Sequence, residues 1–336
     1  MKKYNVLVTG ANGFVGSNIV KTLLKNRFNI YALVRRTSDL SFLKPIRNKI
    51  KLVYGDIRDK DSLRHTFKRE IDIVIHTAAY ASDWGNYELF YAINVCGTKN
   101  ICELALEYKI KHLIHISSIS VYGFNKRINA TEDTPVIKNS FPYCKSKLEG
   151  ENTVRHFIKV FNLPATIVQP GIIYGPNDRT MSYKMIDALL KRRFGISDSG
   201  KHLLSPLYIE NLMQAILLIL KKPKISIGKT YIITDNIKIT WAEFTNIFCK
   251  YLNAPFPWLN LPRFLAFIAA FFSESIYKLL MMKSPPLITF YRVALITSEF
   301  HFVPKKIMNE LGYKPDTNIK RNIQKTIKAY FKYKAQ

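Results

Sequence analysis

The chain has 336 residues, of which 48% are hydrophobic and 22% charged, as is usual for a globular protein with one large domain and a smaller lobe. Its 51 lysines and arginines exceed its 24 acidic residues and give a net charge of +27. The basic residues are scattered and no nucleic-acid motif accompanies them, so we expect no nucleic-acid partner. A general bias towards lysine, or attraction to anionic membrane lipid, would each explain the charge.

The cysteines form neither a C-x-x-C pair nor a spacing typical of metal ligands; they are Cys96, Cys102, Cys144 and Cys249. His76 and His115 lie within apolar segments and are expected to pack in the core rather than to bind a metal. No signal peptide is recognisable. We therefore expect reduced thiols, no metal site and a cytoplasmic protein.

The first predicted strand is followed by a glycine-rich turn and then by helical spacing of apolar residues. The turn reads Thr9-Gly10-Ala11-Asn12-Gly13-Phe14-Val15-Gly16. In such an arrangement Gly10 allows a sharp turn, Gly13 leaves room where the backbone approaches a pyrophosphate, and Gly16 lets the helix pack against the sheet. The helix N-terminus, at Phe14 and Val15, then faces the phosphate charge. The turn predicts a dinucleotide site; the alternative is a structural turn that binds nothing.

Strands and helices alternate along the next part of the chain. Strands are predicted over 30–34, 51–54, 72–76, 113–116 and 165–168, and long helices over 86–108 and 142–161. This alternation indicates an α/β fold, a doubly wound parallel sheet of Rossmann type that binds ligands at the carboxyl ends of its strands. We assign residues 1–178, with 205–235 returning to them, to a dinucleotide-binding domain. Residues 179–204 and 236–336 are assigned to a smaller, mainly helical C-terminal substrate lobe.

Two arginines follow the second predicted strand, where an acidic residue would bind the ribose hydroxyls of NAD. Arg35 and Arg36 instead offer guanidinium groups, whose geometry suits a 2′-phosphate. The sequence therefore favours NADP as the cofactor. If the two arginines point to solvent, NAD remains the alternative.

The spacing Gly10-x-x-Gly13-x-x-Gly16 after a threonine resembles the short-chain dehydrogenase/reductase superfamily, and Gly-Phe-Val-Gly resembles its extended branch. The resemblance covers nearly the whole chain and implies a nicotinamide cofactor with a catalytic tyrosine and lysine. It also implies further residues around the cofactor, with Asn94 bracing the active-site backbone as well. They are Asp56 and Ile57 at the adenine, and Ala78, Ala79, Asn94 and Pro170.

Tyr143 and Lys147 lie four residues apart in a predicted helix and therefore on one face of it. A phenol is a poor base at neutral pH, and a lysine cation beside it lowers its pKa. The resemblance implies that Tyr143 is the acid/base and that Lys147 also holds the nicotinamide ribose. It assigns Ser118, in the segment Ser-Ser-Ile-Ser-Val-Tyr-Gly, to the substrate oxygen. Ser120 competes for this role, because alternation along an extended segment points both serines the same way.

The substrate branch is indicated by departures from the family pattern. Nucleotide-sugar enzymes usually carry an arginine that reaches the sugar diphosphate, and this chain has Leu204 at that position. Gln169 replaces the arginine of the family's Arg-Pro-x-x-x-Tyr-Gly-Pro segment. The sequence Tyr-Ile-Glu-Asn at 208–211 and the residue Trp84 resemble the branch that contains 3β-hydroxysteroid dehydrogenases and 2-alkyl-3-oxoalkanoate reductases.

Residues 261–286 are strongly apolar, but their uninterrupted apolar length is too short for a membrane span. They predict either a buried helix of the small lobe or an interfacial helix that Lys278 and Lys283 steer to anionic lipid. In either case, a hydrophobic lobe over the site suits an apolar substrate.

Taken together, these patterns predict a nicotinamide-dependent oxidoreductase that transfers a hydride to or from a 3-oxo/3-hydroxy steroid-like or lipid substrate, with Tyr143 as the acid/base. One alternative is a nucleotide-sugar epimerase, dehydratase or reductase, and another is a non-catalytic NAD(P)-binding module. Peripheral contact with an anionic membrane is left open. Homodimers formed through the helices that contain Asn94 and Tyr143 are common in the family, so the resemblance implies such a pair.

Overall fold

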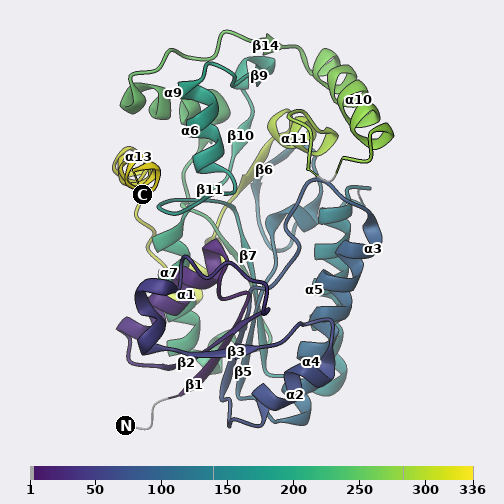
Figure 1. The fold of residues 1–336 in the computed structure, drawn as a ribbon, viewed down its shortest axis with the longest axis vertical. Helices are drawn as coiled ribbons and strands as arrows, with labels where there is room; N and C mark the ends of the chain where they lie inside the picture. The colour runs from purple at the N-terminus through teal and green to yellow at the C-terminus, as the bar shows by residue number, and fades with distance from the viewer. Residues whose placement is uncertain (1–3, 139, 283, 336) are drawn as a thin grey trace.

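A seven-stranded parallel sheet forms the centre of the computed structural model, which describes residues 4–138, 140–282 and 284–335 (Figure 1). The strand order is β12-β7-β5-β4-β1-β2-β3, so the winding reverses between β1 and β4. The strands are β1 (Asn5–Thr9), β2 (Asn29–Val34), β3 (Lys51–Tyr54), β4 (Ile73–His76), β5 (His112–Ile116), β7 (Ala165–Pro170) and β12 (Thr230–Ile233). The doubly wound α/β fold is therefore confirmed.

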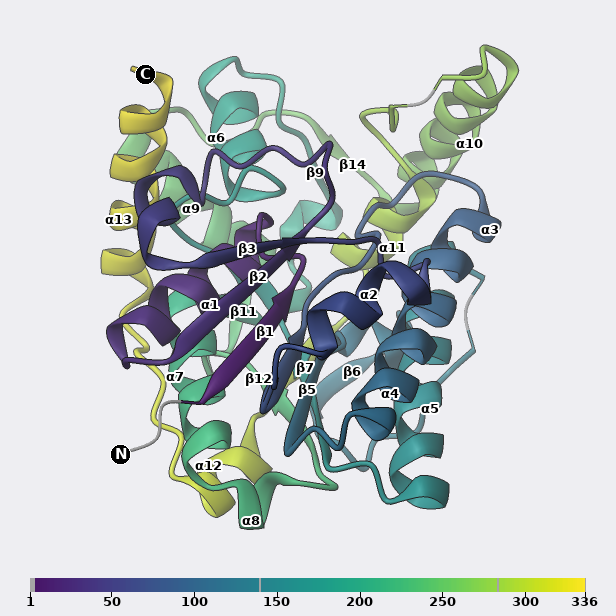
Figure 2. The same cartoon turned by 60° about the horizontal axis from the view of Figure 1, so that its bottom comes forward.

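Helices cover both faces of this sheet because its strands are apolar on both sides (Figure 2). In β1, Val6 and Val8 pack towards α1 (Phe14–Lys25) and α7 (Ile209–Lys221). Leu7, between them, faces the opposite layer. That layer consists of α2 (Lys60–Phe67), α4 (Gly97–Glu107) and α5 (Pro142–Phe161).

The helix predicted over 86–108 is interrupted. The structure has α3 (Tyr87–Phe90), a π-helical turn (Tyr91–Cys96) and then α4. The wider turn rotates Asn94 into the protein, where its side chain bonds the backbone of Tyr80. The pattern of apolar residues did not predict the interruption, because it reports the buried face and not the local winding. The helix predicted over 142–161 is confirmed as α5.

The small lobe lies over the carboxyl ends of the central strands (Figure 1). Its helices include α6 (Ser182–Leu190), α9 (Trp241–Leu252), α10 (Arg263–Leu279), α11 (Phe290–Ile296) and α13 (Ile319–Lys334). Short helices α8 (Pro223–Ser226) and α12 (Lys305–Leu311) lie beside β12 and α7. Four short strand pairs lie outside the central sheet, and the first of them joins the two parts of the molecule. They are β6 (Arg127–Ala130) with β15 (Phe300–Phe302), β8 (Ile172–Tyr174) with β11 (Pro206–Tyr208), β9 (Ile196–Ser197) with β14 (Asn260–Leu261), and β10 (Leu203–Leu204) with β13 (Ile239–Thr240).

A buried carboxyl group lies where the central sheet meets this lobe. Oδ1 of Asp235 accepts hydrogen bonds from the backbone amide of Tyr208 and from Nδ2 of Asn211, each at 2.7 Å. Oδ2 has no hydrogen-bond partner of good geometry among the described residues. Burial raises the pKa of Asp235 to about 7 in spite of the bonds to Oδ1.

We expect Asp235→Asn to stabilise the protein more at about pH 8 than at about pH 5. A carboxyl whose pKa is 3.8 when unfolded and about 7 when folded lowers stability progressively as the pH rises between these two values. The variant should therefore gain about 2 kcal/mol more at the higher pH. Urea unfolding at the two pH values measures the difference, with the exposed Asp39→Asn as the control. An equal gain at both would contradict the assignment.

Candidate active site

The glycine-rich turn between β1 and α1 forms a cradle. Gly10 has a φ of +63°, and a Cβ on it would lie 2.8 Å from Cα of Ala78. A Cβ on Gly16 would overlap the carbonyl oxygen of Gly10, whereas one on Gly13 would meet only that oxygen, at 3.3 Å. Gly13 is exposed, caps α1 without a side-chain hydrogen bond, and no acidic residue follows in the first turn. The amides at Phe14 and beyond are thus left for an anion, which fits the phosphates of a dinucleotide.

The predicted cofactor border continues at the end of β4. The backbone amide of Ala78 donates to Oγ1 of Thr9, at 3.1 Å, and Thr77 Oγ1 donates to the carbonyl of Thr9, at 2.6 Å. Ala79, the next residue, is exposed. These bonds hold the segment after β4 against the turn, so its small side chains line the space beside Gly10.

The predicted adenosine side holds several cations. Arg35 and Arg36 are exposed directly after β2, and the Arg36 guanidinium lies 5.5 Å from the centre of the Tyr54 ring. Asp56 forms a two-point ion pair with Arg58, at 2.7 and 3.1 Å. This hydrogen bonding, and then the charge of Arg35, keep the pKa of Asp56 below its usual value. Ile57 turns away from this surface and packs beneath α4, at Gly97.

Tyr143 and Lys147 both project from α5 towards the end of β5. Nζ of Lys147 donates a 2.7 Å hydrogen bond to the carbonyl of Ile116, the last residue of that strand. Burial lowers the pKa of Lys147 to about 8, although the carboxylate of Glu151 opposes the change. Burial also raises the pKa of Tyr143 to about 12, and the hydroxyl of Ser118 opposes that rise. The structure thus brings Ser118, Tyr143 and Lys147 together.

The side chains of the serine segment after β5 have different neighbours: Ser117 faces Glu151, and Ser118 and Ser120 lie near Tyr143. Ser117 donates to Glu151 at 2.5 Å, on the α5 side. Oγ of Ser118 accepts from the amide of Ser120, at 3.1 Å, and caps a short 3-10 helix. Oγ of Ser120 lacks a partner of good geometry among the described residues, and like Ser118 it counteracts the raised pKa of Tyr143. Both serines therefore remain candidates for the substrate oxygen.

Asn94 ties the active-site helices together. Its Oδ1 accepts from the amide of Tyr80, at 2.7 Å, and its Nδ2 donates to Oγ of Ser146, at 2.9 Å. That hydroxyl in turn donates to the carbonyl of Tyr143, at 3.0 Å, and the carbonyl of Asn94 accepts from Thr98. These bonds connect the π-helical turn directly to the first turn of α5.

His76 and His115 are buried in β4 and β5, as expected for core histidines. His76 bridges Thr9 and Thr98, at 2.8 and 3.1 Å, and its ring lies 5.4 Å from that of His115. Burial, and then the charge of Lys147, lower the pKa of both, that of His76 to about 3. The two rings are therefore neutral at physiological pH and add no positive charge near Lys147.

Gln169, the residue that replaces a family arginine, is buried, and both its amide nitrogen and its amide oxygen are hydrogen-bonded. Its Nε2 donates to both carboxylate oxygens of Glu151, at 3.0 Å each, and its Oε1 accepts from the hydroxyl of Tyr122, at 3.0 Å. Arg155 pairs with the same carboxylate from the more exposed side, at 2.7 Å. Pro170 follows as the buried last residue of β7.

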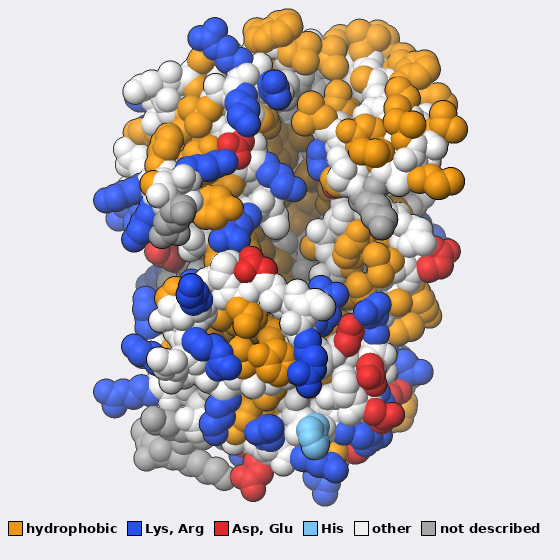
Figure 3. Space-filling view, in the orientation of Figure 1, with side chains coloured by type: hydrophobic (Ala, Val, Ile, Leu, Met, Phe, Trp, Pro, Cys, Tyr) orange, Lys and Arg blue, Asp and Glu red, His pale blue; other side chains and the backbone are white. Residues whose placement is uncertain are grey.

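The sequence did not reveal the contribution of α11. The ring of Tyr291 stands edge-on to Tyr143, with centroids 6.0 Å apart, and also contacts Phe124 and Phe141. Such a contact spans almost half the chain, and no local pattern reports it. In the space-filling view, a hollow containing hydrophobic side chains opens between the α6 and α10 sides of the small lobe (Figure 3).

Residues 6–234 match the model of the NAD dependent epimerase/dehydratase family. The chain belongs to this family. It is 29% identical to 3beta-hydroxysteroid-dehydrogenase/decarboxylase isoform 1 of Arabidopsis thaliana, over 98% of this chain and 80% of that protein. It is 32% identical to dTDP-D-glucose 4,6-dehydratase of Dictyostelium discoideum, over 70% of this chain and 59% of that protein.

Solved structures show the same fold. The dTDP-glucose 4,6-dehydratase of Bacillus anthracis, solved in complex with NAD, matches with a TM-score of 0.79 and 23% identity, over 99% of this chain and 98% of that one. The family member described here is accordingly an NAD(P)-dependent enzyme of the extended short-chain dehydrogenase/reductase type. Relatives include both steroid dehydrogenases and nucleotide-sugar enzymes.

Proposed function

We propose that this enzyme interconverts a 3-hydroxyl and a 3-oxo group on a steroid-like or other lipid substrate. The observation that carries the proposal is Leu204. It is fully buried in β10, paired with Ile239, and belongs to the hydrophobic core. The position at which nucleotide-sugar enzymes usually carry a diphosphate-binding arginine therefore offers a substrate no charge. The aromatic side chains around Tyr143 and Tyr291 favour an apolar substrate further.

Tyr143 exchanges a proton with the substrate oxygen in the proposed reaction. Ser118 holds that oxygen and stabilises the charge that develops on it. Lys147, fixed by its bond to Ile116, lowers the pKa of Tyr143 by its positive charge once the site is filled. The nicotinamide cofactor supplies the hydride donor or acceptor when bound, and the exposed amides after Gly13 would hold its phosphates.

A turnover panel of 3-ketosteroids, β-keto lipids, and UDP- and dTDP-sugars tests the proposal. We expect turnover of an apolar ketone and none of the sugars, because a buried leucine occupies the position of the diphosphate-binding arginine. Turnover of a nucleotide sugar would replace the proposal by the epimerase or dehydratase alternative. Cofactor binding without turnover of any compound would favour a non-catalytic module.

We further propose NADP as the preferred cofactor. The double variant Arg35→Ser/Arg36→Ser should raise the Kd for NADPH about tenfold or more, because the guanidinium partners of the 2′-phosphate are removed. The Kd for NADH should change little. Fluorescence titration of both cofactors measures the difference, with Arg64→Ser on α2 as a control for charge alone. Equal affinity of the native protein for both cofactors would contradict the preference.

Two proposals concern larger partners. One is contact of the small lobe with an anionic membrane, for which the exposed apolar face of α10 is the basis. Pairing into a homodimer through α5 and the segment around Asn94 stays a prediction, and light scattering of the purified protein measures it.

A further inference from the structure

The outer face of α10 is both apolar and exposed. On its inner face, Ala266 and Ala270 pack against Val293 of α11. On the outer face the side chains are large, hydrophobic and between 40% and 82% exposed: Phe264, Leu265, Ile268, Phe271, Phe272, Ile276 and Leu279. A surface helix of a globular protein carries polar side chains on its outer face, so this helix is built for another environment.

Neighbouring segments extend this area. Trp258, just before β14, is 80% exposed, and Leu280, Met281 and Leu287, after α10, are 63% to 88% exposed. In Figure 3, hydrophobic side chains gather over the α10 side of the small lobe. We call the outer face of α10 together with these four residues the α10 surface. Apolar areas of this kind on a monomer mark contact with another protein or a membrane.

The α10 surface has almost no negative charge. Between residues 254 and 287 the only acidic residue in the sequence is Glu274. Its carboxylate accepts hydrogen bonds from a backbone amide of α11, at 2.8 Å, and from Lys278, at 3.4 Å. Arg263 and Lys278 are exposed on α10, and Lys283 lies outside the described residues.

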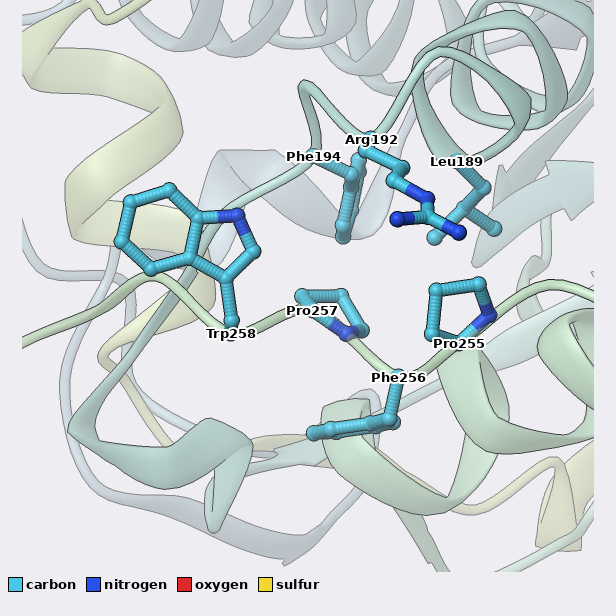
Figure 4. Close-up of a pocket in the computed structure, with 7 residues that line it drawn as sticks. All are labelled: Leu189, Arg192, Phe194, Pro255, Phe256, Pro257 and Trp258. Carbon is cyan, nitrogen blue, oxygen red and sulfur yellow. The ribbon is translucent and has the colours of Figure 1, made fainter.

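A basic cluster adjoins the α10 surface. Lys191, Arg192 and Arg193 follow α6 directly, and all three are exposed. Figure 4 shows the Arg192 guanidinium pointing into the space between the end of α6 and the segment that ends at Trp258. This cavity of about 250 Å³ is also lined by Leu189, Phe194, Pro255, Phe256 and Pro257. A guanidinium at the edge of an apolar surface suits the phosphate of a lipid headgroup.

We propose that the α10 surface lies in the interface of an anionic lipid bilayer, with Lys191, Arg192 and Arg193 at the headgroups. None of the helices in the described ranges has both the length and the apolar content needed to cross a membrane, and α10 has 17 residues. It therefore lies along the interface. A second copy of the chain suits the surface less well, because pairing through this face would bring together two sets of the exposed Lys191, Arg192 and Arg193 with no free acidic partner among residues 254–287.

This docking would bring the bilayer close to the segments that contact the candidate catalytic residues. Nε1 of Trp84 donates to the carbonyl of Met282, at 3.0 Å, next to the α10 surface. Asp83 pairs with Arg292 of α11, at 2.7 Å, and the preceding residue, Tyr291, contacts Tyr143. These contacts connect the α10 surface to Tyr143 through residues 83–84 and α11. The docking proposal does not depend on which substrate is turned over.

Flotation of the full chain with vesicles tests the proposal. We expect the protein to float with vesicles of equal parts phosphatidylcholine and phosphatidylglycerol, and much less with phosphatidylcholine alone. Phe271→Ser/Phe272→Ser should weaken binding about 100-fold, because the variant lacks two exposed aromatic rings that the bilayer would bury. Lys191→Gln/Arg192→Gln/Arg193→Gln should weaken binding to the anionic vesicles by a similar factor.

The matched control is Val160→Ser/Phe161→Ser, which removes an apolar pair of similar exposure, 53% and 51%, at the end of α5. Cofactor titration shows that each variant is folded. Absence of flotation with anionic vesicles would overturn the proposal, as would an equal loss of binding in the control variant. A dimer in light scattering that Phe271→Ser/Phe272→Ser abolishes, without vesicle binding, would assign the surface to a second copy instead.

Discussion

Replacing Tyr143 by phenylalanine should lower kcat roughly 100- to 10,000-fold while leaving cofactor affinity nearly unchanged. The substitution removes only the hydroxyl that exchanges the proton. The ring remains, so its edge-on contact with Tyr291 and the packing of the first turn of α5 are kept. Steady-state turnover of the best compound from the substrate panel, together with fluorescence titration of the cofactor, measures both quantities.

The matched control for this prediction is Tyr291→Phe. It removes the hydroxyl of the ring that stands edge-on to Tyr143, and we expect kcat to stay within a few-fold of the native value. Retained activity in Tyr143→Phe would contradict the assigned acid/base role. A comparable loss of kcat in both variants would show that turnover depends on the polarity around the two rings and not on one proton donor.

Gly13→Ala should weaken cofactor binding about 100-fold without destabilising the protein, because its Cβ enters the open side of the cradle. That Cβ meets only the carbonyl of Gly10, at 3.3 Å, and the residue has a φ of −77°, which alanine adopts readily. Gly16→Ala differs, since its Cβ overlaps that same carbonyl. We expect it to lower the free energy of unfolding by about 1–3 kcal/mol.

Thermal unfolding and cofactor titration of the two alanine variants separate a binding role from a structural one. Normal cofactor affinity in Gly13→Ala would show that no phosphate approaches this part of the backbone. Loss of stability in Gly13→Ala would show that the turn serves the fold first.

Local patterns predicted the central sheet and the helix that carries Tyr143 and Lys147. The run from Asn5 to Thr9, the glycines after it and the four-residue spacing of Tyr143 and Lys147 all act within one or two elements. Their consequences follow from strand alternation and helix geometry. For this reason the parallel sheet, α5 and the shared helix face of Tyr143 and Lys147 could be expected from the residues, whereas the place of Ser118 was implied by the family resemblance.

Features that depend on distant contacts could not be predicted in this way. The π-helical turn at Asn94 depends on the backbone of Tyr80 and on α5, and Tyr291 reaches the site from a helix far along the chain. The raised pKa of Asp235 requires knowing that it is buried. Likewise, periodicity showed that α10 is apolar, but only packing shows that its outer face is uncovered.

The residue at position 169 is constrained by its contact with the buried carboxylate of Glu151. An arginine there would put a second guanidinium beside a carboxylate that Arg155 already neutralises, and would leave an uncompensated cation near Lys147. Gln169 and Arg155 instead share the carboxylate of Glu151. Gln169 supplies neutral hydrogen-bond donors, and Arg155 supplies the positive charge. Anyone transplanting this site into a related scaffold should therefore move residues 151, 155 and 169 as one unit.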